Sequence, residues 1–316
     1  MKKYILITGF VFFLILISIN LASAQAQCAN NNCSIDAALV FHSDSYPASI
    51  YYSFYGHNPK IPEPVNSPLT YSWWTPTGVP YATIPSPVSP AFSPSPSVAF
   101  ERSTGYPAVV WYASNYTTFT GFIYYSKWNG ANWSTPEIVY SSTPVSHIVP
   151  VIAIDVNDTV LVAWLEIGSI PESTRILSKY KTSSGWSALQ VVDVLTPGFG
   201  GVGGSYPYSY MSIDMTFRSN IVNGVTIHDA YLVWQEETSS SFVNCGGGPF
   251  PISHFKIFHS YWNGSYWAPG TEIDGQPNPN PPSVPYNVDV RSNIGISSDK
   301  FGNVTAVWSV IEETDP

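Results

Sequence analysis

One unit of about 45 residues recurs along this chain and limits what the chain can fold into. The unit is clearest at residues 98–140, where turns separate four short runs of apolar and aromatic residues. The second run ends in Trp111 and the fourth begins with Trp133, and Trp164 and Trp186 repeat this spacing. Short runs rich in β-branched and aromatic residues, bounded by Gly, Pro, Asn and Ser, predict strands. Each unit is therefore expected to form one antiparallel sheet of four strands.

The turn between the third and fourth strands has its own signature. Asn129-Gly130 fills it in the clearest unit, and Asn263-Gly264 fills it in a later one. Asn-Gly between aromatic-rich runs predicts a hairpin in which both turn residues have positive φ. The third strand carries a Ser followed two residues later by an aromatic residue, at Ser126/Trp128, Ser178/Tyr180 and Ser260/Trp262.

Repeated four-stranded sheets of this size predict an all-β fold, the β-propeller, in which each sheet is one blade. We expect blades at about 36–82, 97–140, 150–193 and 211–274, and a partial blade at 293–316. Residues 36–41 are expected to be a second strand with no first strand before them. Residues 304–308 are expected to add a second strand that 36–41 already supply, so the four to five blades are expected to form an incomplete ring. A closed five-bladed ring is the alternative, and it needs a C-terminal strand beside residues 36–41. In either ring, Trp111, Trp164, Trp234 and Trp308 are expected to fill the space between blades.

The N-terminus predicts export. Lys2 and Lys3 precede an apolar run at 4–21, and Ala22-Ser23-Ala24 offers a small-residue cleavage site, so residues 1–24 are typical of a signal peptide. The alternative is an uncleaved membrane anchor, because the apolar run is nearly long enough to span a bilayer. In the following segment, 25–35, Cys28 and Cys33 are close enough in sequence for a disulfide after export. A secreted or cell-surface location follows.

Charge and composition exclude some partners. The chain has 21 acidic and 12 basic residues, and its Lys and Arg are not clustered, which argues against nucleic-acid binding. Six Asn-x-Ser/Thr sequons are compatible with a surface glycoprotein, namely those at Asn32, Asn115, Asn132, Asn157, Asn263 and Asn303. We expect no cofactor and no metal site. Calcium at the turn 155–158 is the one exception considered, although Asp and Asn in a turn also cap their own backbone.

Two stretches resemble the sialidase-like β-propeller superfamily. They are Asp-Lys-Phe-Gly-Asn-Val-Thr-Ala-Val-Trp at 299–308 and Ser-Lys-Trp-Asn-Gly-Ala-Asn-Trp-Ser-Thr-Pro at 126–136. The resemblance covers about 36–310 and implies a propeller of the kind that sialidases, other glycosidases, lyases and lectins share. The hairpins lack the Asp box (Ser-x-Asp-x-Gly-x-Thr-Trp) of true sialidases. The four arginines are expected to divide between the two faces, so a three-arginine clamp is not expected.

Three long inserts are expected on the propeller face that carries the loops between strands two and three and the links between blades: 197–210, 236–254 and 275–286. Loops on a rigid scaffold often carry function, although tolerated insertions explain them equally well. Within them Tyr206, Tyr208 and Tyr210 offer rings for stacking, and Glu236 and Glu237 offer carboxylates. These five are the candidate ligand-binding residues.

Three functions fit the sequence. The leading one is an exported binding module that recognises glycan, or another cell-surface ligand, through the loop-rich face. The alternative is a glycoside hydrolase, with Glu166, Glu236 and Glu312 as weak catalytic candidates because each follows a second-strand Trp. A structural repeat part of a larger cell-surface protein is the second alternative. No catalytic site is identified, so the sequence favours binding over catalysis.

Overall fold

The fold is all-β and of the propeller type. The computed structural model describes residues 19–22, 37–42, 49–57, 71–75, 81–87, 95–115, 118–143, 148–166, 174–195, 212–222, 225–244, 249–273, 289–299 and 301–312. All regular elements in these residues are strands, and they pair into antiparallel sheets. Across the same residues, no helix is long and apolar enough to cross a membrane.

Four sheets follow one another along the chain, and we call them blades 1 to 4. Blade 1 contains β1 (Ile19–Ala22), β2 (Ala37–His42), β3 (Ile50–His57), β4 (Tyr71–Trp74) and β5 (Ala82–Thr83), with β4 and β5 both paired to β3. Blade 2 contains β6 (Ser97–Phe100), β7 (Pro107–Asn115), β8 (Thr120–Lys127) and β9 (Glu137–Ser142). Blade 3 contains β10 (Ile148–Ile154), β11 (Val160–Glu166), β12 (Arg175–Thr182), β13 (Gly185–Trp186) and β14 (Gln190–Val194). Blade 4 contains β15 (Ile213–Val222), β16 (Val225–Asn244), β17 (Pro249–Trp262) and β18 (Thr271–Glu272). A two-stranded sheet, β19 (Asp289–Ser298) and β20 (Val304–Glu312), forms the C-terminal hairpin.

Successive blades meet through their first strands. β1 contacts β6, β6 contacts β10, β10 contacts β15, and β15 contacts β19. Hydrogen bonds reinforce two of these contacts at equivalent positions. The backbone N–H of Ile152 donates to Ser97 Oγ at 3.3 Å, and that of Ile296 donates to Asp214 Oδ2 at 2.9 Å. First strands that lie side by side, with each sheet extending outward from them, are the defining arrangement of a propeller.

Apolar clusters fill the seams between blades. Each buried cluster draws its residues from two successive sheets, and each of the first three contains one second-strand tryptophan. Trp111, Trp164 and Trp234 are fully buried, which confirms that these three pack in the core. Trp308 is half-buried in a much smaller cluster between blade 4 and the C-terminal hairpin. Val307 beside it is 60% exposed.

The Asn-Gly turns differ from expectation in one respect. Gly130 and Gly264 have positive φ, but neither Asn129 nor Asn263 does. Instead, Asn129 Oδ1 accepts hydrogen bonds from the backbone N–H groups of Ala131 and Asn132, at 2.9 and 2.8 Å. Asn263 caps the equivalent turn in the same way. The expectation of two positive φ values was wrong because the Asn side chain replaces a backbone turn and lengthens the loop.

Blade 1 has a first strand, which the sequence did not predict. β1 pairs antiparallel with β2, and Ile19 lies opposite Phe41. This strand falls inside the segment expected to be a signal peptide, because an apolar run fits an inner strand as well as an export signal. The expectation that no strand precedes 36–41 was therefore wrong. β19 pairs with β20 rather than with β2, which is the expected hairpin and not the alternative closed ring.

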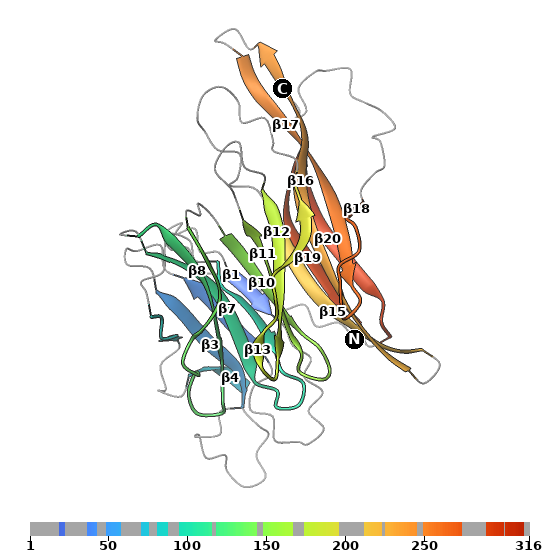
Figure 1. The fold of residues 1–316 in the computed structure, drawn as a ribbon. Coiled ribbons are helices and arrows are strands. Elements are labelled where there is room, and N and C mark those ends of the chain that lie inside the picture. The colour runs from blue at the N-terminus through green and yellow to red at the C-terminus, as the bar shows by residue number, and fades with distance from the viewer. Residues whose placement is uncertain are drawn as a thin grey trace.

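The insert expected as a loop at 236–254 is mostly strand. β16 and β17 continue past the blade as a long hairpin, visible in Figure 1, with a register shift between Glu237 and Ser239. Only 245–248 at its tip lies outside the described residues. The loop prediction was wrong because serines and glutamates at 236–241 carry little strand propensity, and backbone pairing forms without it. The other two inserts, 197–210 and 275–286, lie outside the described residues.

Candidate functional site

The two ends of the blades present different groups. At one end strand two passes into strand three, as β11 does into β12, and we call this the loop face. At the other end lie short hairpins between strands one and two and between strands three and four, and we call this the hairpin face. The sheet order fixes the assignment, because antiparallel neighbours alternate in direction.

Glu166 lies at the loop-face end of β11 and is buried, with 4% exposed. Its Oε1 pairs with the guanidinium of Arg175, the residue directly opposite on β12. Its Oε2 accepts a hydrogen bond of 2.7 Å from the Tyr140 hydroxyl, which comes from β9 of the preceding blade. Both carboxylate oxygens are therefore occupied, and the network joins blade 2 to blade 3.

The other two members of this network face the solvent in part. The Arg175 side chain is 45% exposed, so its charge is only partly withdrawn from water. The Tyr140 ring packs against Trp164 with centroids 4.9 Å apart. Burial, followed by the hydrogen bond to Glu166, raises the pKa of the Tyr140 hydroxyl, so this group stays protonated and acts as a donor. The network presents a fixed guanidinium beside an aromatic ring.

Glu236 occupies the equivalent position in blade 4. Like Glu166 it lies two residues after a buried second-strand tryptophan, and it is also buried. A basic residue, Lys256, lies directly opposite it on β17, as Arg175 does opposite Glu166. Lys256 Nζ makes its ion pair with Glu272, at 2.8 Å. Two successive blades thus repeat an acidic residue opposite a basic one at the loop face.

The remaining predicted site residues are not brought together by the described structure. Glu312 is in β20, opposite Asp289, four residues after Trp308 rather than two, and its side chain is not among those described. Glu237 lies opposite Phe255, and its side chain is likewise not described. Tyr206, Tyr208 and Tyr210 lie outside the described residues. Their role in ligand binding therefore stays a prediction.

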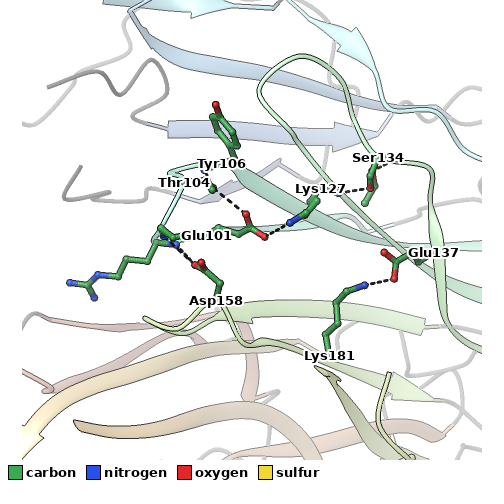
Figure 2. A network of polar contacts seen from close by, with 11 residues as sticks. Glu101, Thr104, Tyr106, Lys127, Ser134, Glu137, Asp158 and Lys181 are labelled. Carbon is green, nitrogen blue, oxygen red and sulfur yellow. Dashed lines mark hydrogen bonds and ion pairs between the residues drawn. The ribbon is translucent and has the colours of Figure 1, made fainter. Parts of the chain in front are cut away.

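The hairpin face holds a separate polar network between blades 2 and 3 (Figure 2). Buried Glu101 accepts hydrogen bonds from Lys127 Nζ at 3.0 Å and Thr104 Oγ1 at 3.1 Å. Asp158 Oδ1 accepts the backbone N–H of Arg102 across the seam, at 2.7 Å. These contacts bind two hairpins to each other, which is a structural role.

Lys181 completes the network on this face. It pairs with Glu137 of blade 2 (Figure 2). Its Nζ also lies 4.9 Å from the centre of the Tyr125 ring and 5.1 Å from that of Trp186. A cation over an aromatic face is attracted by the ring quadrupole. The cation and its ring partners again join blade 2 to blade 3.

In the turn 155–158, which was considered for calcium, the Asp155 carboxylate caps the backbone of the turn. Asp155 Oδ1 accepts the backbone N–H groups of Asn157 and Thr159, at 2.8 and 2.7 Å. Asp299 caps the equivalent turn with the same pattern, through Phe301 and Asn303. Hydrogen bonds from Asn303 and the backbone lower the pKa of Asp299. Within the described part of the chain, no three His, Cys, Asp or Glu side chains gather in a way that could hold a metal ion. Calcium binding stays an untested prediction.

Asp214 on β15 is a partly buried carboxylate whose pKa is raised by desolvation, an effect larger than the opposing hydrogen bonds from Ile296 and Met215 N–H. A raised pKa in the folded state makes the folded protein bind a proton at higher pH than the unfolded chain does. Its contribution to stability is therefore fully present below the unfolded pKa and decreases as pH rises through the folded pKa.

We therefore expect Asp214→Asn to become progressively more stable relative to the wild type as pH rises from about 4, the ordinary pKa of Asp. Urea unfolding of both proteins from about pH 4 to pH 7 measures this difference. The change of this stability difference with pH is the informative quantity, because the loss of a hydrogen bond shifts stability by the same amount at every pH. A difference that does not change with pH would contradict the assignment.

Sequence reasoning missed Tyr140 and Arg175 as the partners of Glu166. The Arg175 pairing had a signal, since the last residue of strand two faces the first residue of strand three. The Tyr140 contact had none, because it crosses between blades and joins residues 26 positions apart.

No family model and no curated protein sequence matches this chain. Among solved structures, a GH43 endo-arabinanase from Bacillus licheniformis is similar over 92% of both chains, with 12% sequence identity and a TM-score of 0.38. Values this low do not assign an activity. The propeller-type fold rests on the sheet order and the contacts between first strands, and neither is specific to sialidases.

Proposed function

We propose that this chain is an exported β-propeller binding module that recognises glycan through its loop face. Neutral sugars suit such a surface, because their C–H faces stack on aromatic rings and their hydroxyl groups exchange hydrogen bonds with polar side chains. The weakly charged, aromatic-rich composition supports this ligand class over a polyanion.

The observation that carries the proposal is that both carboxylate oxygens of Glu166 are occupied. A glycosidase needs two carboxyl groups that can donate or accept a proton or attack the sugar. Both oxygens of Glu166 are already held by Arg175 and Tyr140. A carboxylate held in this way fixes its two neighbours in position. Recognition of a ligand by a rigid loop face therefore fits this site better than catalysis does.

Glycoside hydrolysis is the second candidate, and the buried Glu236 favours it. This carboxylate lies at the same repeat position as Glu166, is buried, and has the basic residue Lys256 directly opposite it on β17. A sialidase activity has no such support. If Glu236→Gln abolished the release of reducing sugar from a neutral polysaccharide, hydrolysis would replace binding as the function.

Replacing Tyr206, Tyr208 and Tyr210 together by alanine is expected to weaken glycan binding at least about tenfold, since each lost aromatic contact costs about 0.5–1.5 kcal/mol. A glycan array followed by calorimetry measures the change. Tyr266→Ala is the matched control, because Tyr266 is 63% exposed on the hairpin face and is expected to leave affinity unchanged. An array without any binding, or equal losses in the variant and the control, would refute recognition through the loop face.

A further inference from the structure

Gln235 breaks the apolar pattern of the repeat. The residue after the second-strand tryptophan points into the seam with the next blade, and it is Tyr112 in blade 2 and Leu165 in blade 3. In blade 4 it is Gln235, which is fully buried. Neither its Oε1 nor its Nε2 has a hydrogen-bond partner in the part of the chain that the structure describes. Buried amides in folded proteins are normally paired, so this one needs an explanation.

Gln235 faces the seam between blade 4 and the C-terminal hairpin. It lies opposite Ile257 on β17 and two residues after Val233, and both of these belong to the cluster in that seam. Paired residues and alternate residues share one face of a sheet. The same seam is polar along β15, where Ser212 Oγ accepts the N–H of Ile294 at 3.3 Å and Asp214 accepts that of Ile296.

This seam also has the smallest apolar core of the four. Val233, Ile257 and Ile294 are its only buried apolar members among the described residues, with Ile296, Ala306 and Trp308 partly buried around them. The other three seams have far larger clusters. Local opening is least costly where little apolar surface is exposed by it. The apolar part of the cost of separating the C-terminal hairpin from blade 4 is therefore smaller than at the other three seams.

We propose that this seam receives a hydroxyl group of a neutral saccharide, with the Gln235 amide as its hydrogen-bonding partner. A hydroxyl both donates and accepts, which matches the unpaired carbonyl and NH₂ of the amide. An unmatched polar group in an otherwise apolar repeat position is typical of a functional site. The inference rests on the proposed glycan recognition and adds where, and by which residue, the ligand is held.

Calorimetry with neutral hexaoses of glucose, galactose, mannose and xylose tests the inference. Gln235→Leu copies Leu165 of blade 3, so it is expected to fold with an unchanged or higher Tm and to bind at least tenfold more weakly. Val307→Thr is the control, because Val307 is exposed on the same hairpin, and it is expected to retain wild-type affinity. Equal affinity of Gln235→Leu and wild type would overturn the inference and leave glycan recognition standing.

Hydrogen exchange on the wild-type protein gives a readout that does not depend on any variant. A bound hexaose is expected to slow exchange at the amides of Ile294 and Ile296, which face blade 4 across the seam. Unchanged exchange with a hexaose that binds would place the ligand elsewhere and overturn the inference. If none of the hexaoses binds the wild type, recognition of neutral glycan fails, and this inference fails with it.

Discussion

Replacing Trp164 by alanine will lower the free energy of unfolding by about 3–5 kcal/mol, the usual cost of truncating a fully buried tryptophan. The Trp164 side chain is 0% exposed and fills the seam between blades 2 and 3. The side chains around Trp164 come from the sheets of blades 2 and 3. Strand pairing holds these sheets in place, so they cannot collapse into the cavity. Denaturant unfolding followed by fluorescence or circular dichroism measures the loss.

Trp308→Ala provides the comparison, because the same residue type at the equivalent repeat position is only half-buried there. We expect it to cost about 1–2 kcal/mol, in proportion to the smaller apolar area that it removes from water. Equal costs at Trp164 and Trp308 would contradict the claim that the first three seams are packed cores and the fourth is not.

Glu166→Ala is expected to cost about 2–3 kcal/mol, since it removes one charged hydrogen bond and one ion pair from a buried group. The Tyr140 hydroxyl loses its acceptor between two blades. The partial exposure of Arg175 keeps the cost below that of a fully buried pair, because water can solvate the released guanidinium. Thermal and denaturant unfolding both report this change.

Glu137→Ala removes a surface ion pair, since the Glu137 side chain that pairs with Lys181 is 45% exposed. A surface pair is worth at most about 1 kcal/mol, so this variant is expected to remain near wild-type stability. If the two variants lost the same stability, Glu166 would not be the buried link between blades 2 and 3.

The repeat could be predicted from the sequence because it depends on local patterns. Short apolar runs and the fixed spacing of Trp111 and Trp133 define strands and hairpins within a single blade. The burial of Trp164 and Trp234 follows from the same pattern, since a large ring at a repeated strand position has to pack against the next sheet. Those parts of the fold are encoded within about 45 residues of each other.

Contacts between blades could not be predicted in this way. Glu166 was a candidate catalytic residue. Its hydrogen bond with Tyr140 depends on how two sheets pack together, and no local pattern specifies that packing. The extension of β16 and β17 into a long hairpin likewise rests on backbone pairing rather than on side-chain propensity. Gln235 had no sequence signal, because a glutamine after a tryptophan becomes unusual only when the seam around it is known.

A crystal structure of this chain tests most directly whether the sheets are blades arranged around first strands. We predict that the Ile152 N–H lies within hydrogen-bonding distance of Ser97 Oγ, and the Ile296 N–H within that distance of Asp214 Oδ2. β6 then lies beside β10, and β15 lies beside β19. Sheets that instead pack through their outer strands, with these first strands apart, would contradict the propeller arrangement.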